Sequence, residues 1–139
     1  MTTGWRYRTL SWLAVAWNAL LCLDTFLIGS RDRTFLAATT PDTIDWLDSM
    51  PIWIMPPWAL GACAGLVGAL LLLDRSPHAV TAFALSLAGW TLTLAWLAAT
   101  GLPAGLATPG VVAILAPVWP VAAGLWWFAR GRRGEGALR

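Results

Sequence analysis

The chain has 139 residues, which is the size of one domain. Apolar residues make up 58% of it and charged residues only 12%, whereas a soluble domain is about a quarter charged. This composition excludes a water-soluble fold, whose exterior must stay polar, and predicts an integral membrane protein surrounded by the lipid bilayer. The net charge of +2 comes from arginines near the expected helix ends rather than on one basic face, so we expect no nucleic-acid partner.

Four stretches are long and apolar enough to cross a membrane as helices, which takes about 20 residues each. They are residues 9–28, 52–73, 79–99 and 110–129. We interpret the first stretch as a retained span rather than a secretory signal, because its apolar run is too long for a signal core and contains Asn18 and Asp24. The sequence therefore predicts an all-α membrane protein, a bundle of four transmembrane helices that forms a single domain over residues 1–139.

The arginines indicate the orientation of these helices. With four spans, both termini and the second connection lie on one side, and that side carries seven arginines: Arg6, Arg8, Arg75, Arg130, Arg132, Arg133 and Arg139. The other side carries Arg31 and Arg33 beside several aspartates. By the positive-inside rule, this bias predicts that both termini lie in the cytoplasm.

The connection between the first two spans contains a predicted helix of its own. Thr40, Pro41 and Asp42 supply a capping hydroxyl, a proline in the first turn and an acid near the positive end of the helix dipole. Apolar and acidic residues then each recur about every three positions, which predicts a short amphipathic helix over residues 41–49 at the outer membrane interface. The last outer connection, residues 100–105, carries no charge and is expected at the membrane surface or against this helix.

The chain resembles a known family through short motifs spread over most of its length. These are Trp17-Asn18, Pro51-Ile52-Trp53, Leu70–Leu73, Arg75, Ala79, Phe83 and Leu85-Ser86-Leu87. With these residues it is similar to small four-span proteins of the bacterial inner membrane that are often labelled sugar-transporter-like. The resemblance implies the four-span topology and a bacterial cytoplasmic membrane, and it leaves the function open. The second connection, Asp74-Arg75-Ser76, departs from similar proteins in having fewer arginines.

Asp24 is the strongest candidate for a functional residue. It lies about 15 positions into the first span, or roughly 22 Å along a helix that rises 1.5 Å per residue, in the outer part of the hydrocarbon. A carboxyl group at that depth is costly and points to a proton or cation site. The alternative is that Asp24 reaches the outer interface or pairs with Arg31 or Arg33.

Three other polar or aromatic residues of the first span accompany Asp24 as candidates. Asn18 shares one helical stripe with Cys22 and Thr25, and Trp17 shares the adjacent stripe with Asp24. We expect both stripes to face the bundle. Asn18 then either hydrogen-bonds a neighbouring helix, which is worth about 1 kcal/mol, or contacts a ligand.

Small residues and prolines interrupt the later spans. In the second span, Gly61, Gly65 and Gly68 form a face that lets helices approach closely, either inside the chain or at a dimer seam. In the fourth span, Pro117 and Pro120 are expected to kink the helix and free backbone carbonyls. Such broken helices are structural in most proteins and line substrate sites in some transporters.

Residues typical of catalytic or metal sites are few. Cys22 and Cys63 have no CxxC spacing and are interpreted as buried apolar residues, and His78, the only histidine, lies at a turn. We find no serine–histidine–aspartate set, no HExxH and no metal-ligand cluster, so we expect neither an enzyme nor a cofactor nor a metal site. The eleven tryptophans include several deep ones, which either pack or line a cavity.

Two functional hypotheses follow from these residues. The first is an accessory or scaffold subunit of a membrane complex, whose partners are the lipid bilayer and another membrane protein. The second is a small homo-oligomeric transporter, at least a homodimer, that uses Asp24 as a proton or cation site.

Overall fold

The computed structural model describes residues 3–138, and over this range every regular secondary-structure element is a helix. Four segments are long and apolar enough to cross a membrane. They are α1 (Thr3–Ser30), α4 (Met55–Leu73) extended by the 3-10 turn η1 (Ile52–Ile54), α5 (Ala79–Thr100), and α6 (Pro109–Leu115) followed by α7 (Val118–Gly134). The predicted four-helix membrane bundle is confirmed, and with it a multi-pass membrane protein. Arg139, one of the seven arginines counted above, lies outside the described residues.

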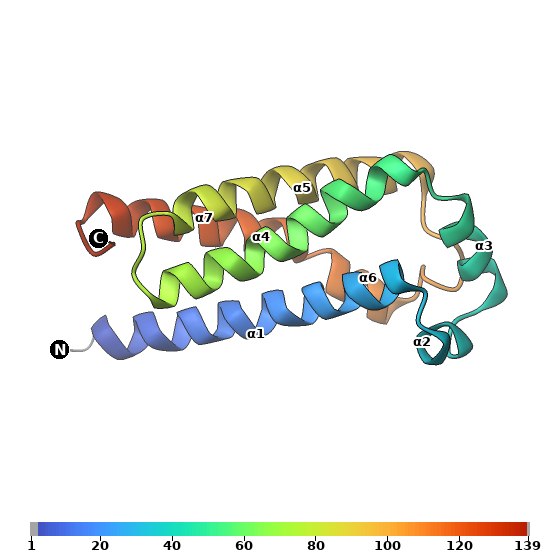
Figure 1. Cartoon of the computed structure of the whole chain (residues 1–139), viewed down its shortest axis with the longest axis horizontal. Helices are drawn as coiled ribbons and strands as arrows, with labels where there is room; N and C mark the ends of the chain where they lie inside the picture. The colour runs from blue at the N-terminus through green and yellow to red at the C-terminus, as the bar shows by residue number, and fades with distance from the viewer. Residues whose placement is uncertain (1–2, 139) are drawn as a thin grey trace.

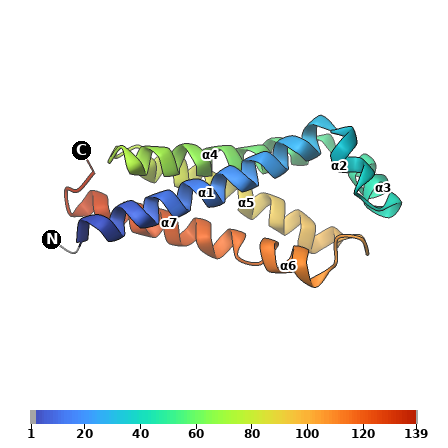
Figure 2. The same cartoon turned by 90° about the horizontal axis from the view of Figure 1, so that it is seen from below.

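Both ends of the described chain lie at the same end of the bundle, which we call the terminal end (Figure 1). The opposite end, the loop end, carries two short helices, α2 (Arg33–Ala37) and α3 (Pro41–Ser49). The helix predicted over residues 41–49 is therefore present. Helix α4 packs on α1 and α5, and α7 packs on α5, so the helices follow the order α1, α4, α5, α7. Towards the loop end, α1 and the α6–α7 segment diverge (Figure 2).

Glycines bring α4 and α5 into close contact. Gly61 of α4 lies against the ring of Trp90, and Gly68 lies against the ring of Phe83. Gly89 of α5 faces the backbone of α4 so closely that an added Cβ would lie 2.5 Å from the Gly61 nitrogen. The small-residue face of the second span is thus used inside the chain, which was one of the two alternatives that the sequence left open.

A buried polar junction joins α1, α4 and α5 near the middle of the bundle. The Ser86 hydroxyl donates to the carbonyl of Gly61 at 2.6 Å. The Asn18 amide donates to the carbonyl of Ala14 at 2.8 Å, and its oxygen faces Gly65. Asn18 is only 4% exposed. Asn18 thus hydrogen-bonds within its own helix. Its contact with α4 depends on the absence of a side chain at Gly65.

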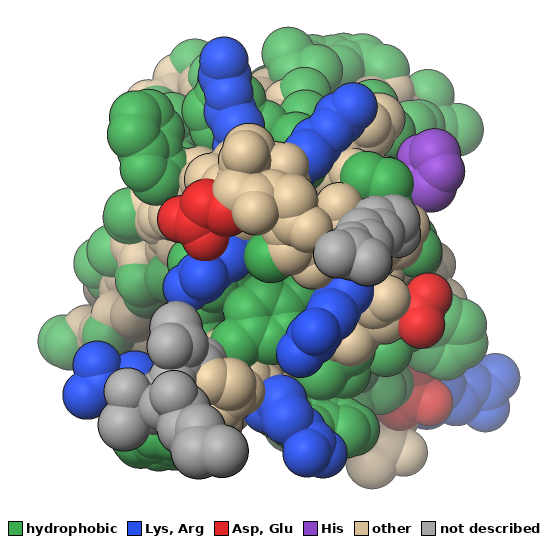
Figure 3. Space-filling model, turned by 90° about the vertical axis from the view of Figure 1, so that its left-hand side faces the viewer, with side chains coloured by type: hydrophobic (Ala, Val, Ile, Leu, Met, Phe, Trp, Pro, Cys, Tyr) green, Lys and Arg blue, Asp and Glu red, His purple; other side chains and the backbone are tan. Residues whose placement is uncertain are grey.

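The terminal end is rich in arginine, as the space-filling view onto this end shows (Figure 3). Here the Tyr7 hydroxyl donates to the carbonyl of Leu72, which ties the start of α1 to the end of α4. The Arg75 guanidinium lies 5.7 Å from the centre of the Tyr7 ring, and that of Arg130 lies 5.3 Å from the centre of the Trp126 ring. Several of the arginine side chains at this end therefore lie against aromatic rings, in cation–π contacts.

The fourth segment breaks at Pro117, as the sequence predicted. Helix α6 ends at Leu115 and α7 begins at Val118, because proline has no amide hydrogen and its ring clashes with the carbonyl four residues earlier, here that of Ala113. Pro120 causes no second break. It lies in the first turn of α7, where amide hydrogens have no partner within the helix in any case.

Candidate functional site

A cavity of about 550 Å³ lies at the loop end, bordered mainly by α1, α3, α6 and the connection between α5 and α6. This volume falls within the range of about 300–1,000 Å³ that is typical of small-molecule sites. The wall is mostly apolar. Its apolar lining includes Leu20, Leu21, Phe35, Leu97, Leu106 and Ile114. We call this space the loop-end cavity.

Asp24 places one carboxyl group in the wall of the loop-end cavity. Helix α1 continues six residues beyond it, so Asp24 lies about 9 Å below the end of the helix, at a rise of 1.5 Å per residue. Arg31, one of its expected partners, instead forms an ion pair with Asp48 at 3.0 Å and donates to the carbonyl of Leu47. Over residues 3–138 the only other ion pair joins Arg132 and Glu135, so neither Arg31 nor Arg33 neutralises Asp24.

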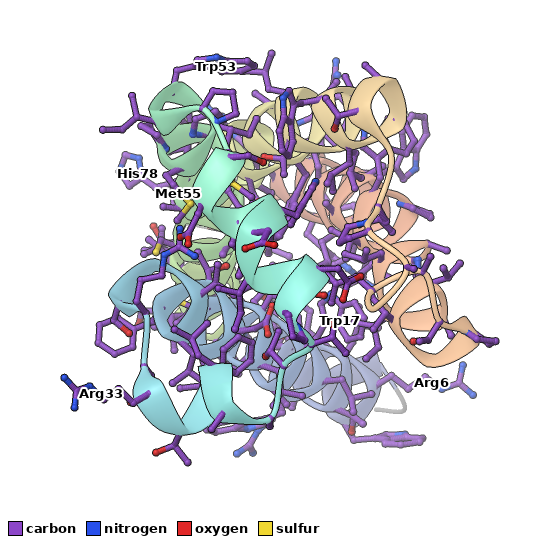
Figure 4. The ribbon with its side chains drawn as sticks, turned by 90° about the vertical axis from the view of Figure 1, so that its right-hand side faces the viewer. Arg6, Trp17, Arg33, Trp53, Met55 and His78 are labelled. Atoms are coloured by element: carbon purple, nitrogen blue, oxygen red, sulfur yellow. The ribbon has the colours of Figure 1, made fainter. Side chains whose placement is uncertain are left out.

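Three tryptophans surround the same space: Trp17 from α1, Trp46 from α3 and Trp58 from α4. In the view onto the loop end, Trp17 lies between α1 and α6, beneath the start of α3 (Figure 4). Trp46 also packs on Trp96, with ring centres 5.7 Å apart. Of the deep tryptophans, Trp17 and Trp58 therefore line a cavity, while Trp90 packs against a glycine.

Helix α3 and the connection over residues 101–108 form a roof across the loop-end cavity. The Asp42 carboxylate accepts a hydrogen bond of 2.9 Å from the Gly105 amide, and the Thr40 and Thr43 hydroxyls lie 2.9 Å apart. Hydrogen bonding by Thr40 and by the Gly105 amide lowers the pKa of Asp42 below its ordinary value. The connection thus packs against the amphipathic helix, one of the two placements that the sequence allowed. Thr40 precedes α3 as predicted, but its side chain makes no cap hydrogen bond.

The flank of the cavity between α1 and α6 is open. The main packing partner of α1 is α4, and that of α7 is α5, which leaves α1 and α6 without extensive mutual contact. Leu20 on α1 is 65% exposed and Ile114 on α6 is 55% exposed, although both line the cavity. Both helices belong to candidate membrane spans, so this opening faces the lipid when the protein lies in a bilayer.

The four candidate residues of the first span separate into two pairs. Asp24 and Trp17 line the cavity, whereas Asn18 and Thr25 are buried on the other stripe. Thr25 donates to the carbonyl of Leu21 at 2.8 Å, within its own helix. The sequence did not single out Trp46 as a site residue. The available signal was its place in the amphipathic helix that covers this end.

No cluster of three or more histidine, cysteine, aspartate or glutamate side chains that could hold a metal ion occurs in the part of the chain that the structure describes. Comparisons of the chain with models of protein families, with curated proteins and with solved structures find no match. The chemistry of the loop-end cavity is therefore what indicates a function.

Proposed function

We propose that the protein is a small membrane transporter for hydrophobic organic cations, with the loop-end cavity as the substrate site and Asp24 as its cation or proton site. The observation that carries this proposal is a carboxyl group without an ion-pair partner over residues 3–138, placed in an apolar, tryptophan-lined cavity. An ionisable side chain inside a span is costly and is kept where it binds an ion, a proton or a charged ligand.

The lining residues match both the positive charge and the apolar substituents of such a substrate. Trp17, Trp46 and Trp58 line the cavity, and a tryptophan ring attracts a positive charge at its face through the ring quadrupole, more strongly where water is excluded. The surrounding leucines and Phe35 suit apolar substituents. A hydrophobic cation dissolves in the bilayer, so it can enter through the open flank between α1 and α6. A neutral apolar molecule would leave the Asp24 charge unpaired.

The arginine bias supports an orientation for this site. The terminal end carries Arg6, Arg8, Arg75, Arg130, Arg132 and Arg133. We propose that this end faces the cytoplasm of a bacterial cell, which places the loop-end cavity in the outer leaflet of the inner membrane. A buried cluster around Phe83 and Leu72 closes the bundle towards the terminal end. Transport would therefore require a rearrangement or the homodimer that the sequence suggested.

Binding can be tested with tetraphenylphosphonium on the purified protein in nanodiscs, at neutral to mildly alkaline pH. We expect quenching of the cavity tryptophans on titration. Asp24→Asn should weaken binding at least about tenfold, which corresponds to 1.4 kcal/mol. The matched control is Asp45→Asn, which removes the same charge from an exposed position on α3 that does not line the cavity.

Two results would refute the cation site. One is equal affinity of Asp24→Asn and the unmodified protein for tetraphenylphosphonium. The other is equally tight binding of neutral triphenylphosphine oxide, which has similar aromatic rings and no charge. Transport is tested separately in proteoliposomes, where Asp24→Asn should abolish accumulation of the cation. Binding without any accumulation would make the protein a binding protein rather than a transporter.

An accessory or scaffold subunit is the second candidate, and the open flank is the observation that favours it. The gap between α1 and α6 can be filled by a helix of another membrane protein, in which case the cavity is part of an interface. Mild extraction from native membranes followed by mass spectrometry of the intact assembly separates the two functions. A foreign partner in fixed ratio would support the accessory role, and a homo-oligomer would support transport.

A further inference from the structure

The two cysteines meet across the contact between α1 and α4. Cys22 and Cys63 are 41 positions apart in the sequence, yet their sulfur atoms lie 3.5 Å apart. The two helices run in opposite directions, so Cys22, one turn beyond Asn18, comes beside Cys63, two residues before Gly65. The close approach at Gly65 brings the thiols together. Cys63 is exposed on the flank of the bundle, which corrects its interpretation as a buried apolar residue.

We propose that Cys22 and Cys63 form a reversible disulfide that links α1 to α4, with a lipid-soluble quinone as the oxidant. The sulfur atoms need to approach by about 1.5 Å to reach the bond length of about 2.05 Å. The proposal requires that rotation of the exposed Cys63 side chain about χ1 supplies this movement. In the reaction two S–H bonds break and one S–S bond forms. The two electrons and two protons released reduce the quinone to its hydroquinone.

The depth of the pair determines which oxidant can reach it. Cys63 lies eight residues after the start of α4 and ten before its end, or about 12 and 15 Å from the two ends at 1.5 Å per residue. This is near the middle of a hydrocarbon core that is about 30 Å thick. Oxidised glutathione and other polar oxidants do not partition there, whereas quinones do. The exposed Cys63 is the sulfur that such an oxidant meets first.

The link would bear on the loop-end cavity, although the proposal does not depend on the cavity's function. Leu21 and Asp24, which flank Cys22 along α1, line that cavity. A disulfide would hold this part of α1 against α4 and prevent it from moving towards or away from α6. Oxidation would then fix the width of the open flank.

The test uses the reduced full-length protein in proteoliposomes, treated with a short-chain ubiquinone analogue and, in parallel, with oxidised glutathione. After the quinone, we expect both thiols to become inaccessible to alkylation in denaturant and the intact protein to lose two hydrogen atoms. A Cys22–Cys63 cross-linked peptide should appear. With glutathione both thiols should stay reduced. Cys22→Ser and Cys63→Ser should each retain one alkylatable thiol and gain no intramolecular link.

Measurements on the unmodified protein are enough to refute the proposal, so the test does not depend on whether the cysteine variants fold. Two thiols that both remain alkylatable after quinone treatment would refute it. So would a linked dimer formed through Cys63 as the only oxidised product, because the pair would then not close within one chain. Oxidation by glutathione at the same rate as by quinone would refute the choice of oxidant.

Discussion

Replacement of Gly89 by alanine tests the close contact between α4 and α5. An added Cβ would lie 2.5 Å from both the Pro57 carbonyl oxygen and the Gly61 nitrogen. This is about 0.9 Å short of the 3.4 Å at which ordinary contacts begin. Both atoms belong to the backbone, so no side-chain rotation can relieve the clash and the two helices must separate. Overpacking of this kind costs about 1–3 kcal/mol, or roughly 5- to 150-fold in the folded-to-unfolded ratio.

Unfolding by a denaturing detergent, followed by tryptophan fluorescence, measures this cost against two matched variants. Gly61→Ala places its Cβ 3.0 Å from the side-chain ring of Trp90, a milder overlap than 2.5 Å from backbone atoms, so its loss of stability should be smaller. Gly124→Ala on α7 meets no atom within 4 Å and should unfold like the unmodified protein. If Gly89→Ala unfolded at the same detergent fraction as Gly124→Ala, the close approach of α4 and α5 would be wrong.

Two further predictions concern the roof of the cavity and the break in the fourth segment. The lowered pKa of Asp42 means that its contact with Gly105 persists from neutral pH to below the ordinary carboxyl value, and is lost as pH falls through the lowered value. Hydrogen exchange should show a lower protection factor for the Gly105 amide in Asp42→Asn, but not in Asp45→Asn, and unchanged protection would contradict the contact. Pro117→Ala removes an obstacle of about 3 kcal/mol to a continuous helix, so α6 should align with α7 and reshape the cavity. We expect weaker tetraphenylphosphonium binding in this variant, and unchanged affinity would show that the break does not shape the site.

The four spans could be predicted because a backbone surrounded by lipid can adopt few structures. A segment without water must satisfy its amides and carbonyls internally, so an apolar run of sufficient length becomes a helix. The amphipathic helix α3 was recognisable for a different reason, since Pro41 and Asp42 mark a helix start whatever lies around them. Helix α2 has only five residues and begins where Asp32 accepts hydrogen bonds from the amides of Thr34 and Phe35. It is too short for a periodic pattern that could be recognised in the sequence.

The candidate site was predictable only where one residue was unusual by itself. Asp24 stood out because a carboxyl group within a span is costly wherever the helix lies. Trp46 and Thr43 did not, because their part in the site depends on α3 folding back over the bundle. The contact of Cys22 with Cys63 likewise follows from the close packing of α1 on α4, and no local sequence pattern predicts it.

The break in the fourth segment lies beside the cavity, because α6, the part before the break, lines it. A proline predicts that a helix is interrupted, but not the direction in which the freed part turns. Here α6 diverges from α1 towards the loop end (Figure 2), and the flank of the bundle opens at the level of Asp24. Ile114 and Leu115 of α6, which precede the break, line the cavity together with Asp24, and Ile114 is 55% exposed. The short helix that the break at Pro117 separates from α7 therefore supplies part of the apolar wall that the proposed organic cation would contact.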